Sequence, residues 1–339
     1  MAQKQVLIIG GGYAGLTVAA RLAEGAGSNA AVTLVDARKE FSQRIRLHEL
    51  LAGRRVRSFR YERLLERRGI RFVHGCAEYL DPDHGRLIVR TAEGCREELP
   101  FDHAVLALGS RTATRVPGVE EHAVRLDEPG LVRQVGARLS GLAHARGRLL
   151  VVGSGLSGIE TAAELAERYP RLRVTLAGSG RLGERFSAAG AAHFRTRLAA
   201  LKVELREEAC VEGLEADNAC FQGGERVPFD LCVWSAGFSA SPLAREAGLA
   251  VDMDGRAQVD AALRSASHPY LFVVGDAARA SGRGAAANVV RGGDADGRPR
   301  RREPLPGAAR RDPAAVPVWV FRALREPGPE GRPAAVRER

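Results

Sequence analysis

The sequence predicts an α/β fold built from two similar units, each a parallel sheet flanked by helices. Two glycine-rich segments predict it: VLIIGGGYAGLTVAARLA near the N-terminus, and LLVVGSGLSGIETAAELA about 143 residues later (Gly10 to Gly153). In each segment an apolar run typical of a buried strand leads through the turn into a helical pattern. Two further segments, FDHAVLALGS and FDLCVWSAGF, also resemble each other, so the repeat extends to the strand that closes each unit.

The glycines of each turn are spaced as the pyrophosphate of a dinucleotide requires. The first allows a tight turn at positive φ, the second lets the backbone approach the pyrophosphate, and the third lets the helix pack on the strand. The pyrophosphate then lies at the helix N-terminus, where free N–H groups favour anions. A glycine-rich turn can also be only a strand–helix connection, but two in the same context indicate an enzyme that holds two dinucleotides. The six glycines are Gly10, Gly12, Gly15, Gly153, Gly155 and Gly158.

The second strand of each unit ends differently. In the first unit AVTLVDAR ends at Asp36, about 20 residues past the last glycine, where an acid can accept hydrogen bonds from a ribose. In the second unit LRVTLAGSGR ends at Ala177, and Ser179 and Arg181 follow. An alanine does not repel the 2′-phosphate of NADPH, and Ser179 and Arg181 could bind that phosphate. The alternative is that the ribose-binding acid has simply been lost and that the ribose of NADH is loosely held. The sequence therefore leaves NADH and NADPH open.

The other elements follow in chain order. Residues 67–92 predict two strands joined by a turn, and FDHAVLALGS predicts a buried strand that ends at Gly109–Ser110. PGVEE (117–121) predicts a crossover at a domain boundary, and a helix is expected near 187–200. HPYLFVVGDAARASG predicts a strand that ends at Gly275–Asp276. Asp276 could hydrogen-bond the polyol chain of a cofactor or cap a helix.

Composition narrows the class of protein. A chain of 339 residues with 45% hydrophobic content suits two domains with real cores. No apolar run approaches the ~20 residues of a membrane span, and no signal peptide is expected. The five cysteines lack C-x-x-C spacing, which predicts a reduced, cytoplasmic protein without a metal site and argues against a dithiol–disulfide reductase.

The net charge of +10 is concentrated at one end of the chain. Residues 282–339 hold 13 Arg and 7 acids, a net of +6, so the remaining 281 residues carry only +4. Nearly all the basic residues are arginine, which suggests GC-rich coding rather than a function of arginine. No nucleic-acid partner is therefore expected.

Together these segments resemble the two-dinucleotide flavoproteins of the pyridine nucleotide-disulfide oxidoreductase superfamily. The nearest branch is the type II NADH dehydrogenases, with ferroptosis-suppressor-like and apoptosis-inducing-factor-like oxidoreductases, and the similarity covers roughly residues 5–281. It implies FAD on the first turn and near RLHELLAG (46–53), and NAD(P)H on the second turn and near WSAGF (234–238). Glu160 matches the acid that the family places near the nicotinamide, although an acid early in a helix also satisfies the helix dipole.

The resemblance implies two sets of cofactor-binding residues. Those for FAD are Gly10, Gly12, Tyr13, Ala14, Gly15, Asp36, Ala37, Arg46, Ala77, Ala107, Leu108, Gly109, Gly275 and Asp276. Those for NAD(P)H are Gly153, Gly155, Leu156, Ser157, Gly158, Ala177, Ser179, Arg181, Ala236 and Gly237. The second domain would be inserted in the first: 1–115 and 237–281 bind FAD, 116–236 bind NAD(P)H, and 282–339 form an irregular Arg/Pro-rich tail.

The implied reaction is hydride transfer from NAD(P)H to FAD, followed by electron transfer to a quinone or similar small acceptor. No side-chain nucleophile is expected, because the cofactor carries the chemistry. The family also implies a peripheral contact with the inner face of the membrane, and a homodimer is possible within it. The alternatives are a ferredoxin-type reductase and a nucleotide-binding pseudoenzyme or redox sensor.

The chain departs from the family after Asp276. The family continues there with a segment like R-M-S-C-x-x-A-x-P-x-G-A-x-A-A, whereas this chain becomes rich in Gly, Pro and Arg, a composition typical of disorder. Codons permitted for 287–297 and 316–337, read with one common single-base offset, can give two family-like segments. We therefore hypothesise a frameshift near residues 278–287, which would impair FAD binding and activity; a natural tail that binds an acidic surface is the alternative.

Overall fold

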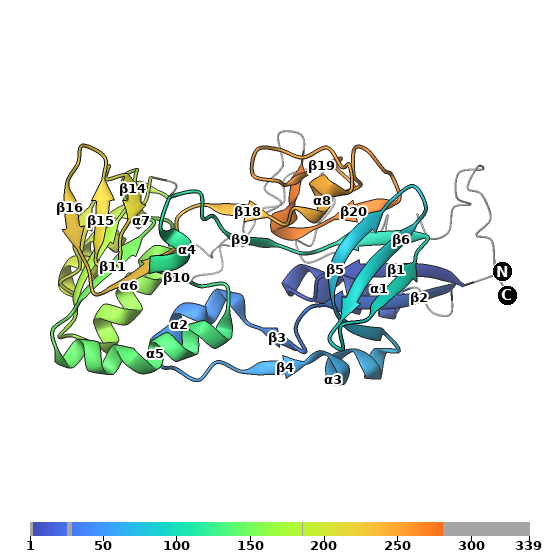
Figure 1. Ribbon diagram of the computed structural model, residues 1–339, viewed down its shortest axis with the longest axis horizontal. Coiled ribbons are helices and arrows are strands. Elements are labelled where there is room, and N and C mark those ends of the chain that lie inside the picture. The colour runs from blue at the N-terminus through green and yellow to red at the C-terminus, as the bar shows by residue number, and fades with distance from the viewer. Residues whose placement is uncertain (1–2, 26–28, 185, 281–339) are drawn as a thin grey trace, which may run out of the picture. The chain divides into compact units, whose positions relative to one another are not determined.

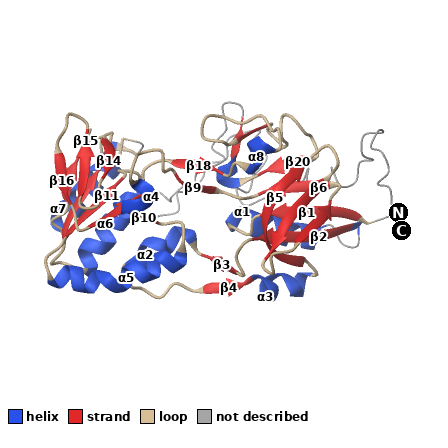
Figure 2. Ribbon diagram, in the orientation of Figure 1, coloured by secondary structure: helices blue, strands red, loops and turns tan. Residues whose placement is uncertain are grey.

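The computed structural model describes residues 3–25, 29–184 and 186–280, and these form two compact units (Figure 1). Unit 1 contains Met1–Phe41, Arg60–Gly109 and the chain from Ala240 onward, and unit 2 contains Ser42–Phe59 and Ser110–Ser239. Both mix helices and strands, as the sequence predicts (Figure 2). The expected irregular tail, 282–339, and most of the proposed frameshift region lie outside the described residues.

Unit 1 is built on a seven-stranded sheet in the order β20-β8-β1-β2-β5-β6-β7. The first five strands pair in parallel, and β6 and β7 add antiparallel hairpins to the edge. The central strands are almost wholly buried, because helices or loops cover both faces of a parallel sheet. The strands are β1 (Lys4–Ile9), β2 (Ala30–Asp36), β5 (Arg71–Asp81), β6 (Arg86–Thr91), β7 (Arg96–Pro100), β8 (His103–Leu106) and β20 (Leu271–Val273).

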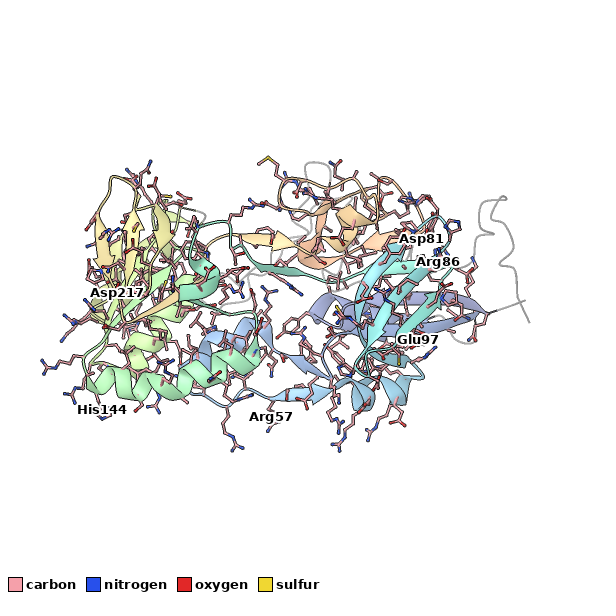
Figure 3. The ribbon with its side chains drawn as sticks, viewed as in Figure 1. Arg57, Asp81, Arg86, Glu97, His144 and Asp217 are labelled. Carbon is pink, nitrogen blue, oxygen red and sulfur yellow. The ribbon has the colours of Figure 1, made fainter. Side chains whose placement is uncertain are left out.

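The main helix of unit 1, α1 (Tyr13–Gly25), buries one stripe of side chains at helical spacing, namely Gly15, Val18, Ala19 and Leu22. An ion pair of Asp81 Oδ2 with Arg86 Nε at 3.0 Å closes the β5–β6 hairpin (Figure 3). The remaining short elements of unit 1 are α3 (Tyr61–Leu65), η3 (Glu66–Arg68), α8 (Leu243–Glu246), β19 (Ala257–Val259), η4 (Gly275–Ala277) and β21 (Ala278–Ala280). The paired strands β3 (Glu40–Ser42) and β4 (Ser58–Arg60) contain the points where the chain passes from one unit to the other.

Unit 2 repeats the scheme with a five-stranded parallel sheet in the order β10-β17-β11-β12-β13. A three-stranded antiparallel sheet and a two-stranded ladder accompany it. Its strands are β9 (Ser110–Thr112), β10 (Ala123–Arg125), β11 (Arg148–Val152), β12 (Arg173–Ala177), β13 (Glu204–Arg206), β14 (Val211–Leu214), β15 (Asn218–Phe221), β16 (Arg226–Pro228), β17 (Leu231–Trp234) and β18 (Phe238–Ala240). Its helices are η2 (Arg44–Arg46), α2 (Leu47–Leu51), α4 (Val119–His122), α5 (Pro129–His144), α6 (Leu156–Arg168) and α7 (Ala188–Ala200).

The segment 42–59 groups with unit 2, although the sequence analysis counts it in the first domain. The reason is apolar packing: Leu47, Leu50 and Leu51 of α2 are buried in the same core as the inner faces of α5 and α6. The approach is close, since a Cβ on Gly136 of α5 would lie 2.7 Å from the carbonyl O of Leu51. The chain therefore enters unit 2 twice.

Most expected element ends are confirmed. β2 ends at Asp36, β12 ends at Ala177, and α7 covers the helix expected near 187–200. Two expected ends are wrong: β8 ends at Leu106 and β20 at Val273, before Gly109 and Gly275. These glycines have φ values of +66° and +68°, which no regular strand adopts. Within the described ranges, none of the helices has the length and apolarity needed to span a bilayer.

Candidate dinucleotide-binding sites

The first glycine turn joins β1 to α1 in unit 1, and each of its three glycines meets a different constraint. Gly10 has a φ of +104°, and a Cβ there would come 2.6 Å from the carbonyl O of Ala107. A Cβ on Gly15 would overlap the carbonyl O of Gly10. At Gly12, in contrast, no atom of the described residues lies within 4 Å of where a Cβ would be. The turn is therefore packed at both ends and open in the middle, where a pyrophosphate would approach.

Two loops that follow neighbouring strands lie beside this turn. The loop after β8 places Ala107 against Gly10 and continues to Leu108 and Gly109, both partly exposed. The loop after β20 comes close to α1, because a Cβ on Gly275 would be 3.1 Å from the Cβ of Ala14. Both loops leave the carboxyl edge of the sheet, the edge at which open α/β sheets bind ligands. The exposed Asp276 belongs to the second loop and lies within η4.

Asp36 is buried at the end of β2 and already holds the turn in shape. Its Oδ2 accepts a hydrogen bond from the backbone N–H of Gly11 at 2.7 Å, and its Oδ1 accepts one from the N–H of Arg38 at 2.8 Å. A carboxylate oxygen has more than one acceptor position, so these bonds are compatible with the predicted bond to a ribose hydroxyl.

Tyr61, which sequence reasoning missed, packs against the first glycine turn and hydrogen-bonds to its backbone. It is fully buried, and its hydroxyl donates to the carbonyl O of Gly11 at 2.8 Å and lies 3.5 Å from Asp36 Oδ2. Burial, together with the negative charge of Asp36, raises the pKa of the Tyr61 phenol well above its ordinary value. The hydroxyl is therefore a permanent donor. A Cβ on Gly11 would come 2.6 Å from the Tyr61 ring.

The other predicted FAD residues of unit 1 lie around this core of the site. Tyr13 begins α1, and its exposed ring meets Phe41 edge-on with 5.0 Å between ring centroids. Ala37 is exposed directly after Asp36, and Ala77 lines a shallow hollow at a register shift in β5. Arg46 is different, because it groups with unit 2, where its guanidinium binds both carboxylate oxygens of Glu49 at 2.6 and 2.7 Å.

The second turn joins β11 to α6 and has the same geometry. Gly153 has a φ of +119°, and a Cβ there would come 2.7 Å from Ser235 Oγ. A Cβ on Gly158 would overlap the carbonyl O of Gly153, whereas Gly155 again has no described atom within 4 Å. Gly155 caps α6 without any side-chain hydrogen bond, so the N–H groups of the helix remain available to an anion.

The predicted nicotinamide-nucleotide residues gather at this turn. Leu156 and Ser157 are exposed in the first turn of α6, and Gly237, with a φ of +68°, follows β17 and the Ser235–Ala236 segment that packs against Gly153. Ala177 is completely buried at the end of β12, and its carbonyl O accepts from the N–H of Gly153 at 2.7 Å. Ser179 and Arg181 follow it and are exposed.

Glu160 lies about one turn after Leu156, the first residue of α6, and faces α2. Its Oε2 is 4.0 Å from Nδ1 of His48, which sequence reasoning missed although the segment 46–53 was singled out. Burial raises the pKa of the Glu160 carboxyl, the positive charge of His48 lowers it, and the neighbouring Glu49 raises it again. The structure therefore sets an acid that is more easily protonated than usual beside a histidine, close to the second turn.

Comparison with known proteins agrees with this geometry. Residues 4–298 match the pyridine nucleotide-disulphide oxidoreductase family. The chain belongs to this family. The match covers more than four-fifths of the chain. The predicted superfamily, the α/β fold with two nucleotide-binding units, FAD and NAD(P)H as cofactors, and the enzyme class of oxidoreductase are thereby confirmed.

Individual relatives are distant. A demethylphylloquinone reductase of Synechocystis is 27% identical over 308 residues, which cover 85% of this chain and 75% of the relative. An NADH dehydrogenase-like protein of Mycobacterium tuberculosis is 32% identical over 192 residues, 52% of this chain and 48% of the relative. The structure of NDH2 from Plasmodium falciparum in complex with NADH superposes with a TM-score of 0.73 at 16% identity, over 82% of this chain and 65% of that one.

Proposed function

We propose that the protein takes a hydride from NAD(P)H onto FAD and passes the electrons to a quinone-like acceptor. The observation that carries the proposal is the pair of glycine turns, each packed at its first and third glycine and open at its second. The turn with an acid at the following strand end can hold the ribose of FAD, and the turn without that acid can accept either NADH or NADPH. When bound, FAD supplies the hydride acceptor and the two-electron store of the reaction.

The side chains of the chain bind and orient the two nucleotides. In unit 1, Asp36 would accept a hydrogen bond from a ribose hydroxyl of FAD, and the N-terminus of α1 would hold its pyrophosphate. In unit 2, the N-terminus of α6 would hold the pyrophosphate of NAD(P)H, and Glu160 would act on the nicotinamide side of that site. The proximity of Glu160 to His48 at 4.0 Å supports a role in which the pair adjusts the local charge rather than attacks a substrate.

The names of the relatives support the quinone-like acceptor, because they include a demethylphylloquinone reductase and several NADH:quinone oxidoreductases. A lipid-soluble acceptor fits a peripheral contact with the inner face of the membrane, and the proposal includes this contact and a homodimer. A ferredoxin-type reductase or a redox sensor is the competing proposal, and the choice of acceptor separates them.

The experiment is an acceptor screen on the purified full chain. Flavin absorbance near 450 nm measures FAD content, and loss of NADH or NADPH absorbance is followed with a water-soluble quinone, a ferredoxin or oxygen. We expect the quinone to give the highest kcat/KM. Turnover with ferredoxin alone would contradict the quinone proposal, and nucleotide binding without turnover by any acceptor would favour a sensor.

The C-terminal frameshift remains a separate proposal. Sequencing the coding DNA around codons 278–287 tests it directly, and a version with the restored frame should hold more FAD and oxidise NAD(P)H faster than the chain as written. If no single-base change restores the family-like reading, or if the present chain is isolated with stoichiometric FAD and full activity, the proposal fails.

A further inference from the structure

Two loops at the carboxyl edge of the unit 2 sheet are joined along their backbones. The first follows β12 and contains Gly178–Arg181, and the second follows β13 and contains Glu207–Ala209. The N–H of Gly178 donates to the carbonyl O of Arg206 and the N–H of Ala209 to that of Gly178, both at 2.9 Å; the N–H of Glu208 donates to Gly180 at 3.3 Å. The two loops therefore hold a fixed position relative to each other.

The first loop lies directly beside the second glycine turn. A Cβ on Gly178 would come 2.5 Å from the Cβ of Ser154 and 3.0 Å from its backbone N, and Ser154 lies between the first two glycines of the turn. In a nucleotide whose pyrophosphate binds the turn, the ribose of the adenosine half reaches the end of the second strand. The loop 178–181 would therefore contact the adenosine ribose and any 2′-phosphate on it.

The charges at this place are already paired. Nε of Arg181 lies 2.9 Å from Oε1 of Glu208, and both side chains are exposed, 73% and 65% respectively. The backbone N–H of Arg181 is 3.4 Å from Oε2 of Glu184. Glu208 has a φ of +52°, unusual for a residue with a side chain, and the inter-loop hydrogen bond of its N–H holds it there.

The neighbouring charged groups are also paired, although Glu207 stays close to Arg181: the pKa of the Glu207 carboxyl is lowered mainly by its bond to Arg195 and in smaller part by the charge of Arg181. Both carboxylate oxygens of Glu207 bind the guanidinium of Arg195, at 2.5 and 2.6 Å. The guanidinium of Arg206 binds Glu204 and Glu225 at 3.0 and 2.7 Å. Among the described residues, the charges near a 2′-phosphate at the loop are thus the guanidinium of Arg181, the carboxylates of Glu208 and Glu184, and the carboxylate of Glu207, which is already bound by Arg195 and by the N–H of Leu182.

We propose that Glu208 sets the coenzyme preference of this protein by neutralising Arg181, so that NADH binds better than NADPH. The inference rests on the proposed function and selects between the two coenzymes that the sequence leaves open. A 2′-phosphate carries up to two negative charges, which the carboxylate of Glu208 repels while it withholds the arginine that would bind them. NADH has only hydroxyl groups there, and a carboxylate can accept their hydrogen bonds.

The test is the substitution Glu208→Gln in the full chain. Dissociation constants for NAD⁺ and NADP⁺ are measured by titration calorimetry, which needs no turnover, and kcat/KM is measured for NADH and NADPH where the acceptor screen gives a rate. We expect the unchanged protein to favour NAD(H). Glu208→Gln should raise the NADP(H)-to-NAD(H) ratio of affinities about tenfold and leave NAD(H) binding within about threefold.

Two further variants make the result specific. Glu215→Gln removes a carboxylate that is also paired with an arginine of unit 2, Arg226 at 2.7 Å, but lies at the β14–β15 turn; it should leave the ratio unchanged. Arg181→Ala combined with Glu208→Gln should lose the gain in NADP(H) binding, because the released guanidinium is the proposed cause.

Four outcomes would overturn the inference and leave the proposed function standing, and the first three are NADP(H) favoured by the unchanged protein, no shift in Glu208→Gln, and an equal shift in Glu215→Gln. Persistence of the gain in the double variant would also overturn it, because Arg181 would then play no part. A protein that binds neither nucleotide would overturn the proposed function and the inference with it, so the two failures are distinguishable.

Discussion

The two glycine turns share one backbone and differ in the side chains behind it. In unit 1 the residue after the first glycine is Gly11, whose N–H is bound by Asp36 and whose carbonyl O is bound by Tyr61. In unit 2 the same place holds Ser154, the strand end is Ala177, and Gly178 fits against the serine. The first turn is thus held by a buried carboxylate and a buried phenol, whereas the second is held by close packing and by the Ser235 hydroxyl, which donates to the carbonyl O of Val152 at 3.0 Å. This difference suits a resident cofactor in one unit and an exchanging substrate in the other.

The largest effect is expected at the third glycine of either turn. Gly15→Ala and Gly158→Ala each place a Cβ on a carbonyl oxygen, which should cost on the order of 3 kcal/mol of unfolding free energy. Each variant should also lose the nucleotide of its own unit. Urea unfolding, FAD content and NAD⁺ titration measure these effects.

The glycine variants have two controls. Gly130→Ala lies in α5 with no described atom within 4 Å of the added Cβ, so it should keep both stability and binding. Gly12→Ala is equally uncrowded but lies where the pyrophosphate approaches; it should keep stability and weaken FAD binding. Equal stability losses in Gly12→Ala and Gly15→Ala would contradict the described division of roles.

The next effect tests the polar fastening of the first turn. Asp36→Ala removes the acceptor for two backbone N–H groups, and it should weaken FAD binding by about 2 kcal/mol, roughly thirtyfold. NAD⁺ binding to unit 2 should not change. The matched control is Asp102→Ala, because Asp102 also accepts from a backbone N–H, that of Gln5 at 2.7 Å, but at an exposed site. Flavin fluorescence titration of the apoprotein would compare the two, and equal FAD affinities would refute the assignment.

Tyr61→Phe should have a smaller effect of about 1 kcal/mol on the free energy of unfolding. It removes one buried hydroxyl and leaves the Gly11 carbonyl without that donor, while the ring that packs behind the turn remains. Urea unfolding at pH 7 measures it. An unchanged midpoint would mean that the hydroxyl does not help to hold the turn.

The smallest expected effect concerns pH. His48→Ala removes the positive charge that lowers the pKa of Glu160, while burial still raises it, so the Glu160 pKa should rise. The limb of the pH profile of kcat/KM for NADH that reports Glu160 should move to higher pH by less than about one unit. Glu160→Gln should remove that limb. A shift to lower pH in His48→Ala would show that the two side chains do not interact as the 4.0 Å distance suggests.

The local features of both sites could be predicted from the sequence, and the distant ones could not. The six glycines, Asp36 and Ala177 belong to a strand–turn–helix–strand pattern whose spacing is fixed along the chain. Tertiary packing brings together residues that are far apart in the sequence. Tyr61 lies 50 residues from Gly11, and Glu208 lies 27 residues from Arg181. His48 could not be predicted for the same reason: helix α2 follows the first strands of unit 1 in the sequence but packs with α5 and α6 of unit 2.

One consequence of the buried Tyr61 concerns how sequences of this kind can change. The G-x-G-x-x-G pattern allows any residue between its first two glycines, which here is position 11. In this protein, however, a Cβ at position 11 would lie 2.6 Å from the Tyr61 ring, so any side chain there would clash with the ring. A larger residue at 11 is therefore tolerated only together with a smaller one at 61. We expect the two positions to vary as a pair among relatives, and a mutational library randomised at position 11 alone to return glycine.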